Sequence, residues 1–290
     1  MNGEHIAKAG DRSAGRLMLR RLLPRPLRNF MRGPGATARW LAQECEYRFG
    51  YAPECTVRQG WTVRCHPASC SAFEDVRAGE DYSAELDGFV SRCTDGMKLL
   101  DVGSHFGLFT LAALRFGGPT ARVVAADPSA YANHVLRANL KLMSGLERVN
   151  VVEAAVGARV GELPMLTAGA NGLHFLVPAN SDRSDATLTK MTTVSELVST
   201  LGCPFTHIKI DVEGHEQDVL AGGIDYIGRF KPLIFLELHG QILRDDGRDP
   251  VAITNLLADC GYHKYEWRGR AIDAQHAGEM DVARIVCLPD

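Results

Sequence analysis

The chain has 290 residues, of which 46% are hydrophobic and 23% are charged, and its formal net charge is −3. This composition excludes a globally disordered protein, because such chains are poor in apolar residues. No apolar run approaches the about 18 residues that a membrane-spanning helix needs, which excludes an integral membrane protein. The length fits one α/β domain with an N-terminal addition, since such folds reach about 250 residues as one unit.

The chain begins with a basic segment. Residues 1–40 carry a charge of +7, which leaves −10 for residues 41–290. Residues 41–290, with their charge of −10, would bind a polyanion poorly, so we expect no nucleic-acid partner. We predict a flexible basic leader over residues 1–35, interrupted by prolines from Pro24 onward. A contact with nucleic acid, anionic lipid or an acidic partner stays open for this leader, as does an organelle transit peptide.

Residues 36–95 are predicted to form an N-terminal cap made of helices and a hairpin. A short helix is expected over 36–47 and a longer one over 80–93. Between them, residues 56–64 alternate apolar and polar side chains around a glycine, which is typical of a β-hairpin.

Eight cysteines are scattered along the chain, and none forms a Cys-x-x-Cys pair. A zinc ribbon or a thioredoxin-type site is therefore not expected. The leader lacks the apolar core of a secretory signal, so we predict reduced thiols in a cytoplasmic protein. Cys55, Cys65, His66 and Cys70 lie close together, but their spacing matches no recognised metal site. We predict no metal.

From residue 96 to residue 290, short apolar runs alternate with helical patterns. Strands are predicted at 98–102, 121–126, 149–152, 207–211 and 233–237, with two late candidates near 262–267 and 283–288. Helices are predicted at 109–116, 129–143, 194–201 and 251–260, with another ending at Leu220. This alternation indicates an α/β fold, a mostly parallel sheet with helices on both faces. Ligands of such sheets bind beyond the carboxyl ends of the strands.

The first of these strands ends in a glycine turn. Gly103 permits a tight turn and a close approach of the ligand, and Gly107 permits close packing of helix on sheet. A dinucleotide site needs a second glycine where this chain has His105, which argues against a bound pyrophosphate. Asp101 suits a ligand that carries an amine or a sulfonium cation. We predict that these four residues, together with Ser104, form part of the cofactor site.

Asp127 follows the second strand, 24 positions after Gly103. An acid at about this distance is placed to accept hydrogen bonds from ribose hydroxyls, although it would also be favourable simply as a helix N-terminal residue. Together with the loop it indicates an adenosyl ligand with a positive group and no pyrophosphate, which is S-adenosylmethionine. After the third strand, Ala154 and its small neighbours leave room for an adenine ring or serve only close packing.

The fourth strand leads into a dense group of ionisable residues. The segment Lys209-Ile210-Asp211-Val212-Glu213-Gly214, followed by Glu216, resembles the FkbM family of S-adenosylmethionine-dependent methyltransferases. The first-strand loop, the Asp127-Pro128 turn, Ala155-Val156-Gly157 and the segment Leu236-Glu237-Leu238-His239 resemble it too, in the expected order. The likeness covers roughly residues 70–240. It implies a Rossmann-like class I methyltransferase fold, with a seven-stranded, mostly parallel sheet within residues 96–290.

Two positions depart from the family pattern. The family shows Ala-Asn after the first loop glycine, where this chain has Ser104-His105, and Glu-Pro where it has Asp127-Pro128. Aspartate still accepts hydrogen bonds from both ribose hydroxyls. His105 is expected to alter the contacts around the methionine part of the cofactor.

Methyl transfer to a hydroxyl is an in-line displacement that alignment and a general base accelerate. We predict His239 as the base, because it follows the fifth strand and the pKa of histidine lies near neutrality. His215 and Asp211 are the other candidates. Asp211 could instead orient the acceptor or bind a divalent ion together with Glu237, because Mg²⁺ favours oxygen ligands. Lys209 is expected at least to pair with these carboxylates.

The family resemblance favours O-methylation of a hydroxyl on a small metabolite, a sugar or a polyketide. The alternatives are a methyltransferase that acts on a macromolecule, a protein that binds S-adenosylmethionine without catalysis, and an NAD-dependent dehydrogenase. We expect residues 36–95 and 163–190 to supply the lid or the acceptor pocket, but loops on this fold vary freely and the sequence does not name the acceptor. It does not give the oligomeric state either.

Overall fold

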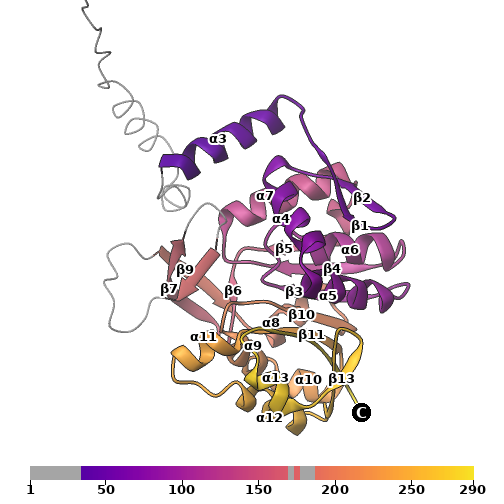
Figure 1. The fold of residues 1–290 in the computed structure, drawn as a ribbon, viewed down its shortest axis with the longest axis vertical. Helices are drawn as coiled ribbons and strands as arrows, with labels where there is room; N and C mark the ends of the chain where they lie inside the picture. The colour runs from indigo at the N-terminus through magenta and orange to yellow at the C-terminus, as the bar shows by residue number, and fades with distance from the viewer. Residues whose placement is uncertain (1–33, 169–172, 177–186) are drawn as a thin grey trace, which may run out of the picture.

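The fold is built on one large sheet. The computed structural model describes residues 34–168, 173–176 and 187–290, so nearly all of the leader predicted at 1–35 lies outside the described residues. Within them, eight strands form a sheet in the order β13-β12-β14-β11-β10-β3-β4-β5 (Figure 1). The strands are β3 (Lys98–Val102), β4 (Arg122–Ala126), β5 (Val149–Val152), β10 (His207–Ile210), β11 (Leu233–Leu238), β12 (Lys264–Trp267), β13 (Arg270–Ile272) and β14 (Ala283–Leu288).

The five strands from β11 to β5 are parallel, whereas β14 and β12 run antiparallel to their neighbours. The predicted α/β fold is confirmed. The short strand β13, which pairs with β12, makes eight strands in the described chain where seven were expected. The chain places β4 and β5 on one side of β3, and later β10 and β11 on its other side. The strand order therefore reverses between β3 and β10, and a crevice opens there at the carboxyl ends.

Helices cover both faces of this sheet, because alternate residues of β3 enter two separate apolar cores. Leu99 packs in the core built with α4 (Pro67–Ala78), α5 (Glu80–Ser91), α6 (Leu108–Phe116) and α7 (Ala130–Leu142). Leu100 packs in the other core, built with α8 (Val194–Leu201), α9 (Glu216–Ala221), α10 (Ile224–Phe230), α11 (Gly240–Asp245), α12 (Val251–Asp259) and α13 (Ala274–Glu279). Successive side chains of a strand point to opposite faces. β3 thus buries side chains on both faces, as expected for a strand inside a parallel sheet.

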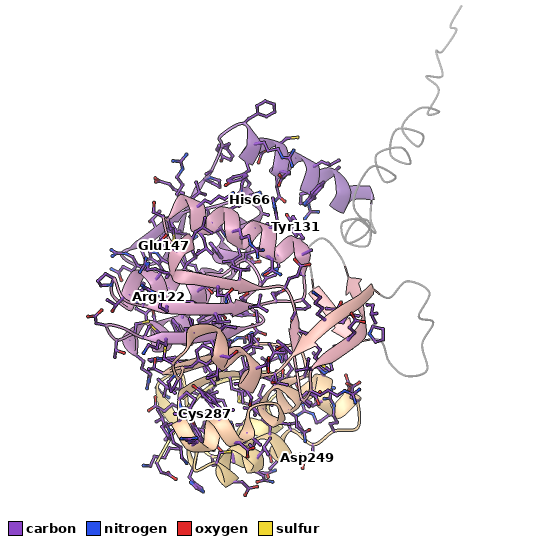
Figure 2. The ribbon with its side chains drawn as sticks, turned by 180° about the vertical axis from the view of Figure 1, so that it is seen from behind. His66, Arg122, Tyr131, Glu147, Asp249 and Cys287 are labelled. Atoms are coloured by element: carbon purple, nitrogen blue, oxygen red, sulfur yellow. A yellow bond between two sulfur atoms is a disulfide. The ribbon has the colours of Figure 1, made fainter. Side chains whose placement is uncertain are left out.

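The N-terminal segment packs on the first of these cores. Helix α3 (Pro34–Arg48) lies at one end of the molecule in Figure 1. A hairpin of β1 (Glu54–Arg58) and β2 (Trp61–Arg64) follows it, as predicted. The Trp40 ring lies 6.2 Å from Tyr131, and the Tyr47 ring lies 4.7 Å from His66. Tyr131 and His66 are labelled in Figure 2. These contacts fix α3 on the body of the protein.

The sequence predicts neither helix α4 nor the disulfide that joins it to the hairpin. No helix is predicted over 67–78, although Pro67 is typical of a first helical turn and His66 caps the helix by accepting a hydrogen bond from the Ala68 amide. Cys55 and Cys70 are joined by a disulfide that ties the hairpin to α4. The prediction of reduced thiols is wrong for this pair, because only the unpredicted helix brings the two side chains together. The other six cysteines are free.

A second, smaller sheet lies beside the large one (Figure 1). Its strands in the described chain are β6 (Ala155–Val156), β9 (Thr187–Thr192), β7 (Gly161–Ala168) and β8 (Leu173–Leu176), in that order. The segment 163–190, predicted as lid or pocket, contributes to three of these strands where the structure describes it. A 3₁₀ turn, η1 (Leu146–Arg148), precedes β5. Among the described helices, none combines the length and the apolar character of a membrane span.

Candidate active site

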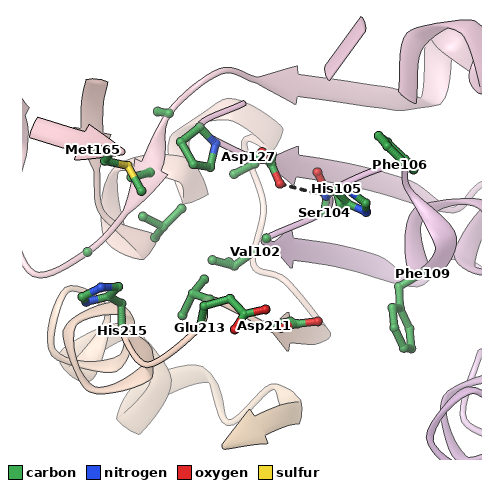
Figure 3. A pocket seen from close by; sticks show the side chains of 18 of the residues that line it. Val102, Ser104, His105, Phe106, Phe109, Asp127, Met165, Asp211, Glu213 and His215 are labelled. Atoms are coloured by element: carbon green, nitrogen blue, oxygen red, sulfur yellow. Dashed lines mark hydrogen bonds between the residues drawn. The ribbon is translucent and has the colours of Figure 1, made fainter. Parts of the chain in front are cut away.

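A cavity of about 800 Å³ lies at the carboxyl ends of β3, β4 and β10, where the strand order reverses. Its volume falls within the about 300–1,000 Å³ typical of small-ligand sites. Figure 3 shows Asp127 and His105 on one side of it, and Asp211 and Glu213 on the other. Of the residues predicted for the site, those that line the cavity are Gly103, Ser104, His105, Asp127, Ala154, Asp211 and His215. Those that do not line it are Asp101, Gly107 and His239.

The glycine turn after β3 fits tightly against the end of β10. Gly103 has a φ of +78°, and a Cβ at this position would lie 1.8 Å from the carbonyl oxygen of Asp211. Only glycine satisfies both the left-handed backbone and this close approach. The turn therefore presents its backbone to the cavity with no side chain at its first residue.

Asp127 is held by two backbone amides. Its Oδ2 accepts a hydrogen bond from the His105 amide at 2.9 Å, and its Oδ1 accepts one from the Ser129 amide at 2.8 Å. The carboxylate is buried and lines the cavity. A carboxylate oxygen can accept more than one hydrogen bond. The side chain is thus fixed in an orientation that suits a pair of ligand hydroxyls.

Two further observations test whether S-adenosylmethionine fits this cavity. Ser104 is buried against the cavity, and its Oγ has no hydrogen-bond partner among the residues that the structure describes. A buried hydroxyl of this kind calls for a polar group of a ligand. On the neighbouring wall, Ala154, Val156 and Met165 form an apolar surface. An apolar wall next to fixed polar groups is what a nucleoside with a charged tail requires, so the residues fit the cofactor.

Asp101 and Gly107 lie outside the cavity lining, and their contacts hold the fold together. Asp101 is buried and accepts a hydrogen bond from Thr110 Oγ1 at 2.6 Å, which ties β3 to α6. Burial raises the pKa of its carboxyl to about 6. A Cβ on Gly107 would lie 2.2 Å from Leu136 Cδ1, so this glycine lets α6 approach α7. The expected contact of Asp101 with a cofactor cation is not supported by this geometry.

Lys209 lies next to Asp211, outside the cavity lining, and is 1% exposed. Its Nζ lies 3.0 Å from Glu85, 3.8 Å from Asp211 and 3.9 Å from Glu237. Burial alone lowers the pKa of Lys209, but these carboxylates outweigh it and hold the pKa above its ordinary value. Glu85 is the partner that the sequence could not show, because it comes from α5. Lys209 therefore stays charged and anchors Asp211.

His239 is also buried, at 5% exposed. Its Nδ1 lies 2.7 Å from Glu216 Oε1, and its Nε2 lies 3.7 Å from Glu213 and 3.9 Å from Asp211. Burial lowers the pKa of His239, but the bond to Glu216 and the nearby carboxylates outweigh it and raise the pKa to about 9. An imidazole that keeps its proton at neutral pH is a poor general base. The structure thus does not support the first choice for this role.

Glu213 is the site residue that the sequence reasoning missed. The sequence predicts no role for it beyond its place in the family motif, yet it lines the cavity beside Asp211. Its φ is +50°, a strained value for a residue with a side chain and one that gathers at functional sites. Burial raises the pKa of its carboxyl. His215 also lines the cavity, with Nδ1 3.4 Å from Asp218. The signal for Glu213 was present in the motif that contains Asp211.

Solved structures with a similar fold include methyltransferases. The methyltransferase FkbM from Methylobacillus flagellatus KT matches at 15% identity with a TM-score of 0.43, over 66% of this chain and 48% of that one. This chain therefore spans about half of that relative. The O-methyltransferase from Bacillus cereus in complex with SAH matches at 12% identity and a TM-score of 0.42, over 76% and 90% of the two chains. The S-adenosylmethionine-dependent O-methyltransferase from Thermotoga maritima matches at 11% identity and a TM-score of 0.42, over 71% and 64%.

A comparison with curated proteins finds no match. The methyltransferase FkbM domain, in contrast, matches residues 101–264, which is more than half of the chain. The match begins at the end of β3, before the glycine turn, and includes the whole carboxylate segment after β10. The chain therefore belongs to the FkbM methyltransferase domain family, whose members take their methyl group from S-adenosylmethionine.

Proposed function

We propose that this protein transfers the methyl group of S-adenosylmethionine to a hydroxyl of a small molecule. The observation that carries the proposal is the single cavity that joins the Gly103 turn and Asp127 to the carboxylates Asp211 and Glu213. A methyl donor and a group that takes up a proton are both needed for this reaction, and one cavity provides for both.

At the donor side, Asp127 would hold the two ribose hydroxyls. Ser104 and His105 would lie along the methionine part, and Ala154 would face the adenine. The fixed orientation of Asp127 between two amides supports this assignment. When bound, the cofactor supplies a methyl group on a sulfonium, and the chain's own contribution is to hold it in line with the acceptor.

At the acceptor side, the hydroxyl would lie against Asp211 and Glu213. The acceptor oxygen bonds to the methyl carbon as the carbon–sulfur bond breaks, and the hydroxyl proton must leave. Carboxylates within reach stabilise that loss. His239 behind them holds their charge in place through its contacts at 3.7 and 3.9 Å. His239 thereby becomes a positioning residue in place of the base predicted from the sequence.

The cavity size supports a small acceptor. At about 800 Å³ it is close to the upper end of the small-ligand range, so it has room for a second molecule beside the cofactor. Tyr82 and Phe73 of the N-terminal segment line it too. The prediction that residues 36–95 supply pocket material is thus supported in part by α4 and α5. The cytoplasmic location stays a prediction.

The first test is calorimetry with S-adenosylmethionine, S-adenosylhomocysteine and NAD. We expect the first two to bind and NAD to fail. Asp127→Ala should weaken binding by about tenfold or more, since it removes hydrogen bonds worth about 1–3 kcal/mol. The control is Glu153→Gln, an exposed acid next to the cavity. Equal affinity of Asp127→Ala and wild type would overturn the ribose assignment.

The second test is turnover of methyl-labelled S-adenosylmethionine with a library of small hydroxyl compounds. Label in a methyl ether supports the proposal. Cofactor binding without any methylated product would point to a non-catalytic binding protein instead. Label found only on a macromolecule, and lost when residues 1–33 are deleted, would favour the macromolecular alternative that the +7 N-terminal charge keeps open.

A further inference from the structure

We propose that Asp211, Glu213 and His239 bind a divalent cation at the acceptor side of the cavity. The ion's catalytic role rests on the proposed function, whereas its binding does not. The sequence pointed to no metal, or at most to one held by Asp211 with Glu237. The structure selects a different set.

The three ligand atoms converge. One oxygen of each carboxylate and one imidazole nitrogen all lie within 4.8 Å of one another. His239 Nε2 is 3.9 Å from Asp211 Oδ1 and 3.7 Å from Glu213 Oε2. These separations are too long for hydrogen bonds. Ligands that lie about 2.0–2.2 Å from one ion are about 3–3.5 Å apart, so a small closure would complete the site.

A second observation concerns His239 itself. The ring is 5% exposed, and its Nδ1 lies 2.7 Å from Glu216 Oε1, a fully buried carboxylate. A carboxylate only accepts hydrogen bonds, so Nδ1 carries a proton. Its Nε2 lies 3.5 Å from Glu237, 3.7 Å from Glu213 and 3.9 Å from Asp211, separations that are long for hydrogen bonds. A divalent cation would take the place of the Nε2 proton and release it, as metal binding does at other histidines. A buried histidine whose other nitrogen is fixed by a carboxylate is the usual arrangement of a metal ligand.

The local charge also favours a cation. Two permanently cationic side chains lie in this region, and both are already paired: Lys209 with Glu85 at 3.0 Å and Arg284 with Glu237. Glu213 therefore has no ion pair with either of these two cations in the described chain. The carboxylates that surround the site are Glu85, Asp211, Glu213, Glu216 and Glu237. These five carboxyl groups outnumber Lys209, Arg284 and His239, and a bound divalent cation would offset that imbalance.

The ligand set defines the kind of ion. Two carboxylates and one imidazole suit Mn²⁺, Fe²⁺ or Zn²⁺ better than Mg²⁺ or Ca²⁺, which prefer oxygen alone. Asp211 and Glu213 line the cavity, so the remaining coordination positions face the acceptor. The ion would bind the acceptor oxygen and make its proton easier to lose, as metals do for bound water.

The reaction then balances without any redox step. The acceptor hydroxyl loses its proton to solvent, its oxygen bonds to the methyl carbon, and the carbon–sulfur electron pair moves to sulfur. The products are a methyl ether and S-adenosylhomocysteine, and the ion is unchanged. An acceptor with two adjacent oxygens would fill two open positions at once.

The binding test uses Mn²⁺ on the metal-free, full-length protein, followed by electron paramagnetic resonance, with no acceptor present. We expect one tight site in the wild type. His239→Gln should weaken Mn²⁺ binding by at least tenfold while leaving S-adenosylmethionine affinity unchanged. Glu216→Gln, a positioning variant, should weaken it by about 10–100-fold.

The matched control is His134→Gln. His134 belongs to the other cluster of histidine and carboxylate in the described chain, with Glu44 and His66. In that cluster His66 Nδ1 accepts from the Ala68 amide, which places the proton of the neutral ring on Nε2 and blocks that atom as a ligand. We expect Mn²⁺ binding in this variant to equal that of the wild type. No binding in wild type, or equal binding in wild type and His239→Gln, would overturn the proposal.

A methyl-transfer assay distinguishes failure of the metal proposal from failure of the proposed function. Loss of methyl transfer on chelation, with recovery when Mn²⁺ is added, supports the ion's role. Methyl transfer to a hydroxyl that persists in chelated protein overturns that role and leaves the proposed function standing. Mn²⁺ bound through His239, with no hydroxyl compound methylated, confirms the site and overturns the function.

Discussion

The backbone of Gly103 touches the backbone of Asp211. A Cβ on Gly103 would lie 1.8 Å from the Asp211 carbonyl oxygen, and the φ of Gly103 is +78°. The two residues end or follow neighbouring strands, β3 and β10, whose residues pair in register up to Val102 and Ile210. The turn that we assign to the cofactor and the carboxylate that we assign to the acceptor are thus fixed relative to each other by direct contact.

Gly103→Ala should therefore disrupt both sides of the site. The methyl group cannot be accommodated without moving the Asp211 backbone, so we expect reduced stability and at least tenfold weaker S-adenosylmethionine binding. Gly60→Ala is the control: its φ is +77°, but nothing lies within 4 Å of the added Cβ. It should show only the strain of the left-handed backbone, about 1–2 kcal/mol. Urea unfolding and calorimetry on both variants measure the difference; equal losses would contradict the contact.

Asp101→Asn should change how stability depends on pH. The raised pKa of about 6 means that the folded protein retains a proton that the unfolded chain, with a pKa near 3.8, has lost. The native state therefore binds more protons between these values, and stability falls as the pH rises from about 4 to 6. The asparagine avoids this cost, so the variant should gain up to about 3 kcal/mol at pH 7 and little at pH 4.

Urea unfolding at a series of pH values checks this prediction. The exposed Asp259→Asn serves as the control and should follow the wild-type curve. If Asp101→Asn keeps the wild-type slope between pH 4 and 6, the buried carboxyl is not the group responsible.

Lys209→Met should destabilise the fold by about 3–5 kcal/mol, the usual cost of removing one partner from a buried ion pair. The loss leaves Glu85, whose side chain is 4% exposed, without its nearest cation at 3.0 Å. The double variant Lys209→Met/Glu85→Gln should recover part of that loss, because it no longer buries the unpaired charge. Denaturant unfolding tests this, with the exposed Lys264→Met as control. No recovery in the double variant would mean that Glu85 is not the main partner.

Asp211→Asn and Glu213→Gln should lower kcat by about 10²–10⁴-fold. Both side chains line the acceptor side of the cavity, away from Asp127. S-adenosylmethionine affinity should thus stay within about threefold of wild type, measured by calorimetry beside steady-state kinetics. His215→Gln should have a smaller effect, because His215 lies against Asp218 and outside the carboxylate pair. A larger loss in His215→Gln than in either acid variant would reverse this assignment.

The parallel strands and their loops were predictable because each is a local pattern. β3, β5 and β14 have the predicted bounds, and the glycine turn and Asp127 lie where their spacing places them. Helix α4 escaped prediction because its buried positions include small and polar side chains, Ala68 and Ser69, that give no apolar period. Its cap and its N-terminal proline were the available signals.

The role of His239 was not predictable for a different reason. Its position after β11 suggested a base, but its protonation depends on Glu216, which is 23 residues away, and on carboxylates from another loop. The same holds for Lys209, whose nearest partner Glu85 is 124 positions distant in the chain. Electrostatic environments assembled from remote segments cannot be derived from one strand's sequence.

The cavity wall that α4 supplies has an evolutionary consequence. Phe73 and Val76 line the cavity, yet they precede the region 101–264 that defines the family. In our proposal the donor site and the acceptor carboxylates both come from region 101–264, whereas α4 adds one wall of the acceptor pocket from a separate stretch of the chain. Selection could exchange residues 67–78 and reach a new acceptor while the donor machinery is inherited unchanged.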